Sequence, residues 1–362
     1  MGCLAAVLRE YGKPLTIEEV QLESPRMDEM VIRNTATGVC GTDITMINTP
    51  DRAPLPIVLG HEGAGIVEEV GTGVTEFSPG DHVVMSYGHC GKCADCLAGM
   101  PFRCSQSNRM NFGGSRLDGT SPISKNGEFI HGMFFRQSSF AEYSVVKAQA
   151  AVKVSKDIDL TCLAPFGCGV LTGAGTVFHI FKAQIGSNIA IFGVGTVGLS
   201  AVMAASVASC RTIIAVDINK DKLEKANELG ATHCINPSED QVSRQIHDIT
   251  GGGADFAFDT TGKKEVIHEA FESLKMTGQC AVATGFGVRL EVAIKDIMRG
   301  KSLRGVVLGD SVPRIFIPQL IELKRQGKLP VEQLITKYRF SEINEAIEDF
   351  KKGSAIKPVL IF

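Results

Sequence analysis

The chain has 362 residues, of which 44% are hydrophobic and 21% charged, and this length and composition are typical of a globular α/β protein with two domains. Its formal net charge of −3 gives no support for nucleic acid or an anionic membrane as a partner. No stretch reaches the roughly 20 apolar residues of a membrane span, and the first residues lack the pattern of a signal peptide. We therefore expect a cytoplasmic protein that binds neither membrane nor nucleic acid.

The first 150 residues predict an irregular β domain. Short runs in which apolar and polar residues alternate are separated by Gly, Pro and Asp, as in LTIEEVQL, MVIRNTATGV and AGIVEEVG. Residues 105–139 carry Ser, Asn and Gly with little periodicity. We expect them to form a long loop with a functional role.

Strands and helices alternate from about residue 186 onward. The expected strands are NIAIFG, TIIAVD, THCIN, DFAFD and QCAVAT, and the expected helices span 196–209, 219–229, 239–250 and 264–274. This alternation predicts a parallel sheet with right-handed crossovers. Beyond residue 300 we expect a strand at LRGVV, helices near 314–326 and 341–352, and a final strand KPVLIF.

Four of the eleven cysteines lie close together in the sequence, at Cys90, Cys93, Cys96 and Cys104. The spacing C-x2-C-x2-C-x7-C suits four thiolates that close tetrahedrally around one zinc ion. Four protein ligands leave no open position for a substrate, so such a zinc would stabilise a lobe of the fold. Cysteines that cluster on the surface without a metal are the alternative.

A glycine motif follows the expected strand NIAIFG. Gly193, Gly195 and Gly198 form G-x-G-x-x-G at the start of a helix, and Asp217 ends the next strand. The glycines allow a tight turn, close approach of a pyrophosphate and close packing of helix against strand. Asp217 would accept hydrogen bonds from the adenosine ribose and repel a 2′-phosphate, so the motif predicts NAD in preference to NADP. An ordinary glycine-rich turn is the alternative.

A second set of potential metal ligands is scattered along the chain, with Cys40 in GVCGTD, His61 in GHEGAG and Cys168 in FGCGV. Glycine flanks each of them, as expected where the backbone approaches a metal or ligand closely. Two thiolates and one imidazole with an open fourth position make a catalytic zinc site of the kind used for alcohol oxidation. Spacing alone does not assemble the three residues, and an ordinary core position is the alternative for each.

Over essentially its whole length the chain resembles the zinc-dependent medium-chain alcohol dehydrogenases. The run Gly60-His61-Glu62-x2-Gly65-x5-Gly71-x2-Val74 is similar to the zinc signature of that family, and the four cysteines, the glycine motif and FGCGVLTG occur in the family order. The segment DGTSPISKNGEFIHGMFFRQSSFAEYSVV is most similar to the aryl- and benzyl-alcohol branch, to which geraniol-type enzymes are close relatives.

The resemblance implies two Zn²⁺ ions per chain. The three scattered ligands would hold a catalytic zinc, and the four clustered cysteines a structural one. Asp43 would orient the ligand histidine, and Glu62 would lie beside the catalytic zinc. Thr42 would take the proton of the alcohol.

The resemblance also implies contacts with the cofactor. Asp217 and Lys222 would bind the ribose, Thr172 and Val197 would pack against the nicotinamide, and Lys357 would reach the pyrophosphate.

Two positions depart from the family pattern. Gly41 stands where many relatives have Arg or His against the pyrophosphate, and the loss of a charge-assisted contact of about 1.5–3 kcal/mol predicts weaker cofactor binding. Thr45 stands where some relatives have the histidine that passes the proton to solvent. A threonine does not store a proton near neutral pH, so the outer end of the proton relay stays open.

The resemblance points to an alcohol with a planar group. Phe134, Phe135 and Phe286 match substrate-pocket positions of the family, and Ser86 stands where the side chain is often larger. Aromatic walls favour a substrate with a planar ring. With the family activity, the resemblance implies reversible, NAD-linked oxidation of a primary aromatic or allylic alcohol of the benzyl type to its aldehyde. Phenylalanines that only fill the core are the alternative.

Rival functions stay open at this point. The rival enzymes are a terpenoid alcohol dehydrogenase of the geraniol or perillyl type and a glutathione-dependent formaldehyde dehydrogenase. A non-catalytic NAD-binding sensor is the rival outside catalysis.

The fold that the resemblance implies is α/β with two domains. Residues 1–170 and 305–362 would form a GroES-like, β-rich catalytic domain with both zinc sites, and residues 171–304 would form a Rossmann domain with a doubly wound parallel sheet that binds NAD. A small-molecule substrate would lie between the domains. The resemblance to this family also implies that the chain assembles as a homodimer or homotetramer.

Overall fold

The computed structural model describes residues 1–237 and 241–362, which fold as two compact units. The first unit contains Met1–Cys168, Val312–Glu322 and Val331–Phe362, and the second contains Gly169–Ser311 and Leu323–Pro330. Residues 169–170, 305–311 and 323–330 therefore lie in the second unit, whereas the sequence analysis assigned them to the catalytic domain.

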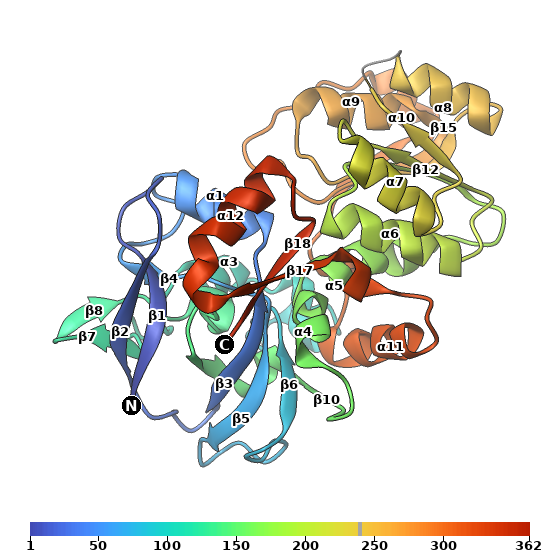
Figure 1. Cartoon of the computed structure of the whole chain (residues 1–362). Coiled ribbons are helices and arrows are strands. Elements are labelled where there is room, and N and C mark those ends of the chain that lie inside the picture. Colours follow the sequence, from blue (N-terminus) through green and yellow to red (C-terminus); the bar gives the residue numbers. More distant parts are fainter. Residues whose placement is uncertain (238–240) are drawn as a thin grey trace. The chain divides into compact units, whose positions relative to one another are not determined.

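The first unit contains two β-sheets in the part of the chain that the structure describes (Figure 1). One sheet has the order β4-β1-β2-β7-β8, with β1 (Gly2–Leu8), β2 (Thr16–Leu22), β4 (Ile57–Val58), β7 (Ile123–Lys125) and β8 (Glu128–Ile130). The other has the order β10-β6-β5-β3-β18-β17, with β9 also paired to β3. Its strands are β3 (Glu29–Gly38), β5 (Gly63–Val70), β6 (His82–Met85), β9 (Tyr143–Lys147), β10 (Ala151–Val154), β17 (Ile335–Arg339) and β18 (Lys357–Ile361). The predicted β domain is confirmed.

Strand β18 connects the C-terminus of the chain to the sheet that carries the site residues. It runs antiparallel to β3, with Val359 opposite Gly38, and the Val39 N–H donates to the Pro358 carbonyl at 2.9 Å. This pairing places Lys357 beside the residues that lead into the first helix. Met30, Ile32, Val67, Val83 and Met85 from β3, β5 and β6 fill the core of the same sheet.

The expectation of a continuous loop over residues 105–139 is wrong. The segment contains helix α3 (Ser107–Phe112), the hairpin of β7 and β8, and a short 3-10 turn at Phe134–Arg136. Strands of three residues are too short to show an alternating pattern, and β7 is ordered by its pairing with β2, which lies far away in the sequence. The other helices that begin in this unit are α1 (Gly41–Asn48), α2 (Ala94–Leu97), α4 (Leu160–Leu163), α11 (Pro313–Arg325) and α12 (Ile343–Lys352).

The second unit contains a parallel sheet with the order β13-β12-β11-β14-β15-β16 among its described residues. This is the strand order of a doubly wound dinucleotide-binding sheet. Its strands are β11 (Asn188–Phe192), β12 (Thr212–Val216), β13 (His233–Ile235), β14 (Ala254–Asp259), β15 (Leu274–Val282) and β16 (Ser302–Gly305). Its helices are α5 (Gly169–Gly175), α6 (Thr196–Val207), α7 (Lys220–Glu228), α8 (Val242–Thr250), α9 (Lys264–Glu272) and α10 (Ile294–Met298). The predicted Rossmann sheet is confirmed.

The helix expected over 239–250 is described only in part, because residues 239 and 240 lie outside the described residues.

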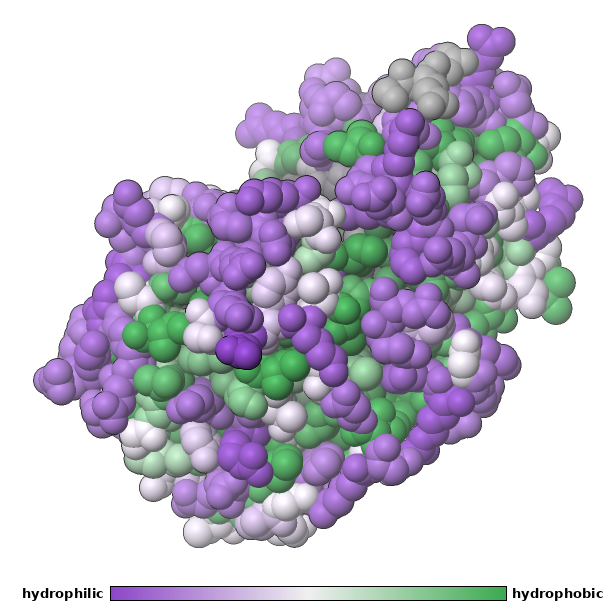
Figure 2. Space-filling model, viewed as in Figure 1, coloured by the Kyte–Doolittle hydropathy of each residue, from purple (hydrophilic) through white to green (hydrophobic). Residues whose placement is uncertain are grey.

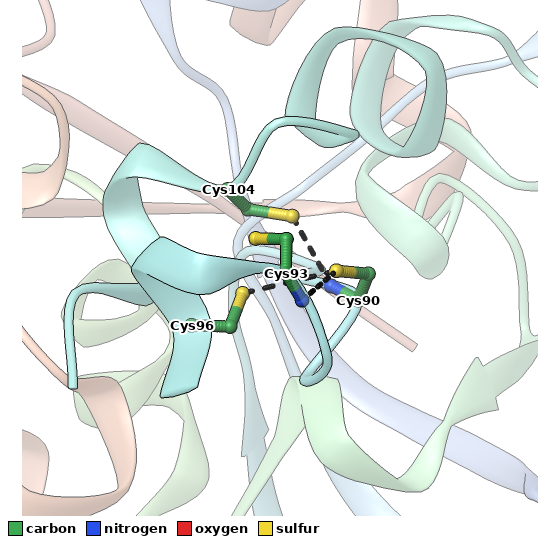
Figure 3. A group of neighbouring side chains, drawn as sticks. All are labelled: Cys90, Cys93, Cys96 and Cys104. Carbon is green, nitrogen blue, oxygen red and sulfur yellow. Dashed lines mark hydrogen bonds between the residues drawn. The ribbon is translucent and has the colours of Figure 1, made fainter. Parts of the chain in front are cut away.

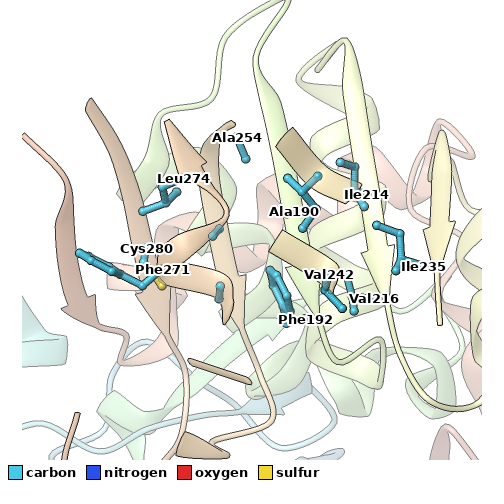
Figure 4. Packing of buried hydrophobic residues seen from close by; sticks show 13 residues of the cluster. Ala190, Phe192, Ile214, Val216, Ile235, Val242, Ala254, Phe271, Leu274 and Cys280 are labelled. Carbon is cyan, nitrogen blue, oxygen red and sulfur yellow. The ribbon is translucent and has the colours of Figure 1, made fainter. Parts of the chain in front are cut away.

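Apolar side chains from the strands and from the helices beside them pack together, as Figure 4 shows for Ala190, Phe192 and Ile214 of the strands with Val242 and Phe271 of the helices. Helices cover the sheet, so its central strands β11 and β12 are buried along their whole length and show no alternation.

No single helix among the described residues is long and apolar enough to cross a membrane. The bent pair Leu160–Gly167 and Gly169–Phe181 reaches that length and apolarity only in combination, and most of its residues are buried in the folded chain. Hydrophilic residues cover most of the face seen in Figure 2, with hydrophobic residues showing between them.

Candidate active site

Cys40, His61 and Cys168 come together in the first unit although they are far apart in the sequence. Their sulfur and nitrogen atoms and a carboxylate oxygen of Glu62 all lie within 4.8 Å of one another. Cys40 immediately precedes α1, His61 precedes β5, and Cys168 follows a 3-10 turn at Ala164–Gly167. The ends of three different elements therefore meet at one point.

His61 is held in one orientation by Asp43. Its Nδ1 lies 3.0 Å from Asp43 Oδ1, and the same carboxylate accepts hydrogen bonds from the N–H groups of Gly60 at 3.1 Å and Cys40 at 3.0 Å. Burial acts to lower the pKa of His61, but the charges of Asp43 and Cys40 outweigh it and raise that pKa well above its usual range. His61 Nε2 is buried and has no hydrogen-bond partner among the described residues. A metal-ligating histidine typically has one ring nitrogen hydrogen-bonded to a carboxylate, while its other ring nitrogen has no partner in the protein.

The pKa values of the two cysteines shift in opposite directions. The hydrogen bond from Cys168 lowers the pKa of Cys40 well below its usual range, against the effect of burial, and the His61 charge acts in the same direction. The pKa of Cys168 is raised by the same contact with Cys40 and by burial. The lowered pKa of Cys40 favours its thiolate, the form that binds metals. Two sulfurs and the unpaired His61 Nε2 fit a zinc ion, with Glu62 beside it.

Glu62 forms a buried ion pair with Lys357. Lys357 Nζ lies 2.7 Å from Glu62 Oε2 and donates a second hydrogen bond to the Val39 carbonyl at 3.0 Å, and the two side chains are 1% and 0% exposed. Burial raises the pKa of Glu62 to about 7, although the Lys357 charge acts to lower it. The other oxygen, Oε1, is buried without a partner among the described residues. The Lys357 ammonium thus lies beside Glu62 and the Val39 carbonyl, and its expected contact with a pyrophosphate stays a prediction.

Helix α1 carries three further residues of the sequence analysis. Thr42 is half-buried in its first turn, two positions after Cys40. Thr45 donates its hydroxyl to the Gly41 carbonyl at 3.0 Å, an ordinary bond to the preceding turn. Gly41 is exposed, and a Cβ added there would meet nothing within 4 Å.

Aromatic rings surround His61. The Phe135 ring lies 4.5 Å from the imidazole, centroid to centroid, and the Phe134 ring lies edge-on at 5.7 Å. Phe112 of α3 and Tyr87 contact Phe135 edge-on at 5.2 Å and 5.9 Å. The sequence analysis missed Phe112 and Tyr87, because only the folded segment 105–139 brings their rings to Phe135.

Ser86 and Phe286 are the other two residues of the expected substrate pocket. Ser86 is buried and donates its hydroxyl to the Gly167 carbonyl at 2.6 Å. Phe286 belongs to the second unit and is 62% exposed there.

Gln137 is a structural link that the sequence analysis missed. Its Nε2 donates to the carbonyls of His61 at 3.1 Å and Ser86 at 3.3 Å, and its Oε1 accepts the Gly63 N–H at 3.0 Å. The amide thus joins the main chain of His61 to the end of β6.

Cys90, Cys93, Cys96 and Cys104 form a second cluster in the same unit, around α2, with sulfur atoms within 4.8 Å of one another (Figure 3). Backbone N–H groups of Cys93 and Cys90 donate to the sulfurs of Cys90 and Cys104, each at 3.3 Å. Hydrogen bonds from the backbone, that of Cys96 first, lower the pKa of Cys93 to about 6. A tetrahedral site with Zn–S bonds of about 2.3 Å has sulfurs about 3.8 Å apart. The 3.9 Å between the sulfurs of Cys90 and Cys96 fits such a site.

The three glycines of the motif have three different roles in the second unit. Gly193 has a φ of +83°, and a Cβ there would lie 2.6 Å from Thr260 Oγ1. A Cβ on Gly198 would lie 2.0 Å from the Gly193 carbonyl oxygen, so this glycine lets α6 pack against the turn. A Cβ on Gly195 would meet nothing within 4 Å, which leaves the backbone open to a ligand.

Asp217 organises the turn that follows β12. Its two oxygens accept the N–H groups of Val194 and Asn219, each at 2.9 Å. Asn219 in turn caps α7 by accepting the Lys222 N–H at 3.2 Å. A pocket of about 320 Å³ opens at this place, lined by Phe192, Gly193, Val216, Asp217, Ile218, Pro237, Val242, Thr261, Lys263, Glu265, Val266 and Glu269. Its position over the glycine motif is where a dinucleotide binds such a sheet.

Thr172 and Val197 lie on two helices that pack closely. Thr172 is buried in α5 and Val197 is half-buried in α6. A Cβ on Gly173 would lie 2.1 Å from the Val197 carbonyl oxygen, so the two helices touch through this glycine.

Comparison with known proteins agrees with both units. The family described as alcohol dehydrogenase GroES-like domain matches residues 26–156, and the one described as zinc-binding dehydrogenase matches residues 196–324. Geraniol dehydrogenase of Castellaniella defragrans is 41% identical over 99% of this chain and 97% of its own.

Two solved structures are similar over the whole chain. An alcohol dehydrogenase zinc-binding domain protein from Burkholderia ambifaria is 44% identical with a TM-score of 0.98, and benzyl alcohol dehydrogenase from Acinetobacter calcoaceticus is 40% identical with a TM-score of 0.96. Each comparison covers 100% of this chain and 99% of the other. The chain belongs to the zinc-dependent medium-chain alcohol dehydrogenases.

Proposed function

We propose that this alcohol dehydrogenase oxidises a primary aromatic or allylic alcohol of the benzyl type to its aldehyde, reversibly and with NAD. The observation that supports this substrate class is a cluster of rings at His61. Phe134 and Phe135 contact its imidazole, and Phe112 and Tyr87 contact Phe135. A planar substrate gains edge-on or offset stacking beside such rings, worth about 0.5–1.5 kcal/mol per pair. A geraniol-type alcohol is the second candidate, since the geraniol dehydrogenase relative is 41% identical.

The proposal includes two Zn²⁺ ions per chain. Cys40, His61 and Cys168 would hold the catalytic zinc, which would supply a Lewis acid that lowers the pKa of the alcohol hydroxyl. Asp43 keeps the His61 ring in place through the 3.0 Å contact to Nδ1. The half-buried Thr42 hydroxyl accepts the alcohol proton and passes it outward. NAD bound at the glycine motif would supply the acceptor for the hydride of the carbinol carbon, so that proton and hydride together would account for both hydrogens removed.

The charge around the pocket at β12 favours NAD over NADP. Asp217, Glu265 and Glu269 line this pocket, and Lys263 is the cation beside them. Three carboxylates would repel a 2′-phosphate, whereas Asp217 can accept hydrogen bonds from a ribose diol.

We also propose that copies of this chain assemble as a homodimer or homotetramer. Strand β16 lies at the edge of the parallel sheet, and an open edge is a template for pairing with another chain. Exposed apolar side chains are concentrated in the same part of the sequence, at Phe286, Ile294, Met298 and Val307. Such a concentration is typical of an interface.

The test is a set of kinetic measurements with metal analysis. We expect kcat/KM for benzyl alcohol to exceed that for ethanol about tenfold or more, activity with NAD and without glutathione, and loss of activity on chelation. A benzyl-to-ethanol ratio near one contradicts the aromatic substrate class, and higher kcat/KM for geraniol selects the second candidate. A single zinc per chain contradicts the catalytic site.

A further inference from the structure

Asp43 anchors two of the three residues that would hold the catalytic zinc. It contacts the His61 ring at 3.0 Å and accepts the Cys40 N–H at 3.0 Å. The third residue, Cys168, directly follows the 3-10 turn at Ala164–Gly167, far from the other two in the sequence. Because a tetrahedral metal site needs its ligands at fixed positions, another contact has to place Cys168 relative to His61.

A chain of buried hydrogen bonds connects the backbone at His61 to the turn before Cys168. Gln137 Nε2 donates to the carbonyls of His61 at 3.1 Å and Ser86 at 3.3 Å. The Ser86 hydroxyl then donates to the carbonyl of Gly167, the residue before Cys168, at 2.6 Å. Gln137 and Ser86 are 0% and 1% exposed, so bulk water does not compete for these hydrogen bonds.

The surroundings of this chain fix its direction and its spacing. Gln137 Oε1 accepts the Gly63 N–H at 3.0 Å, so the donating end of the amide must face the two carbonyls. A Cβ on Gly63 would lie 2.1 Å from Met85 Cε, and one on Gly167 would lie 2.0 Å from the Met85 carbonyl oxygen. The end of β6 therefore contacts both the backbone after His61 and the turn before the third ligand.

We propose that Gln137 and Ser86 are positioning residues that fix the distance between the zinc ligands His61 and Cys168. The inference rests on the catalytic zinc of the proposed function. Without the Ser86 hydroxyl, the turn before Cys168 loses its hydrogen bond to the end of β6. Without the Gln137 amide, the His61 backbone loses its hydrogen bond to the same strand end. Either loss lets the imidazole nitrogen and the Cys168 sulfur separate, although all three ligand side chains remain.

The first test is NMR of the full chain loaded with cadmium in place of zinc. Cadmium binds the same sulfur and nitrogen ligands, and its chemical shift depends on which ligands it has and on their geometry. The wild type should give two resonances, one from the four-cysteine cluster and one from the site of Cys40, His61 and Cys168. Ser86→Ala and Gln137→Met should each shift the second resonance and leave the first in place.

The matched control is Ser121→Ala, because Ser121 is also buried and also donates its hydroxyl to a carbonyl, that of Ile130. Ser121 precedes the hairpin of β7 and β8, and both cadmium resonances of this variant should stay in place. A variant that only loses stability keeps the wild-type resonances in its folded fraction. A shift of one resonance therefore reports the geometry of that site.

The second test is competition for zinc with a chelator. The loss of one hydrogen bond behind the ligands predicts that Ser86→Ala holds the catalytic zinc about tenfold more weakly than the wild type. The affinity of the four-cysteine cluster should not change, and Ser121→Ala should hold both zinc ions as the wild type does.

Two wild-type cadmium resonances that both stay in place in Ser86→Ala and Gln137→Met overturn the positioning role and leave the proposed function intact. A single wild-type resonance, that of the four cysteines, contradicts the catalytic zinc itself and the inference with it. Ser86→Ala removes one oxygen atom and keeps the hydrogen bond from its N–H to the Ala150 carbonyl. This variant therefore decides the question if Gln137→Met does not fold.

Discussion

Lys357 Nζ lies 2.7 Å from Glu62 Oε2, so a lysine at the start of the last strand neutralises the carboxylate next to the ligand His61. Neither partner is accessible to solvent, so each depends on the other for compensation of its charge. Since burial alone raises the pKa of Glu62, the lysine is what keeps that pKa from rising further.

Replacing this lysine should therefore destabilise the protein. In Lys357→Met the Glu62 carboxylate loses its counter-charge, and we expect the free energy of unfolding to fall by about 3–5 kcal/mol. Glu62 should then be protonated at neutral pH, because its pKa is already about 7 with the lysine present. Urea unfolding measures the loss. Combining Lys357→Met with Glu62→Gln should restore part of it, and a double variant as unstable as the sum of the two single variants contradicts the pairing.

Thr42 is the residue that we expect to handle the alcohol proton. Thr42→Val keeps the shape of the side chain and removes the hydroxyl, so kcat should fall by about 10²–10⁴-fold. Zinc content should stay at the wild-type value, since Thr42 is not among the grouped metal ligands. Thr45→Val on the same helix is the control, because the Thr45 hydroxyl is occupied by the Gly41 carbonyl. Wild-type turnover in Thr42→Val removes Thr42 from the mechanism.

Gly41 offers room for a basic side chain. An added Cβ meets nothing within 4 Å, and the family resemblance implies Arg or His at this position. We expect Gly41→Arg to lower the Kd for NAD about tenfold or more, which corresponds to one charge-assisted hydrogen bond. Titration of the intrinsic fluorescence of NADH measures the affinity. Gly41→Ala controls for loss of glycine flexibility, and a Kd unchanged by Arg but changed by Ala contradicts the charge argument.

The four-cysteine lobe should hold its zinc independently of the alcohol site. Cys104→Ser removes one of the four sulfurs, and we expect the zinc content to fall from two to one per chain together with a lower Tm. The ratio of kcat/KM for benzyl alcohol over ethanol should not change in the folded fraction, because the rings around His61 are untouched. Retention of two zinc ions contradicts the four-cysteine assignment.

The sequence was most informative where the functional residues are close together. The four cysteines lie within a single short segment, and Gly193, Gly195 and Gly198 lie within one turn, so their spacing reflects local geometry directly. Cys40, His61 and Cys168 are brought together by tertiary folding, and no local pattern links them. For these three the family resemblance was needed.

The ion pair of Lys357 with Glu62 could not be predicted from the sequence for a comparable reason. Its surroundings are set by the pairing of β18 with β3, strands more than 300 positions apart in the sequence, as Val359 and Gly38 are. The contacts of Phe112 and Tyr87 with Phe135 were missed because the segment 105–139, which contains Phe112 and Phe135, has no periodicity that would reveal α3 or the hairpin. Long-range pairing and irregular segments thus account for the residues that the sequence did not reveal.

A last prediction concerns stability at low pH, through Glu18 on β2. Its carboxylate is paired with Arg9 at 2.7 Å and Lys125 at 2.8 Å, and the side chain is 9% exposed. The hydrogen bond from Arg9 holds the pKa of Glu18 well below its usual range. A carboxyl group in an unfolded chain has a pKa of about 4.3, so Glu18 binds its proton less tightly in the folded state. The contribution of Glu18 to the free energy of unfolding is complete above the pKa of the unfolded chain. It is lost as the pH falls toward the lower pKa that Glu18 has in the folded protein.

Glu18→Gln should consequently lower the free energy of unfolding at pH 7 by about 1 kcal/mol. The difference between variant and wild type should shrink as the pH is lowered from about 5 to about 3. Variant and wild type are compared at the same pH, so any loss of zinc in acid affects both proteins equally. Both clusters of potential metal ligands lie away from Glu18 in the sequence, and the substitution leaves them unchanged. Glu19→Gln on the same strand, where the side chain is exposed, is the control and should show no such trend. A difference between Glu18→Gln and wild type that is equal at pH 7 and pH 3 contradicts the ionic origin of the stabilisation, because a packing defect does not titrate.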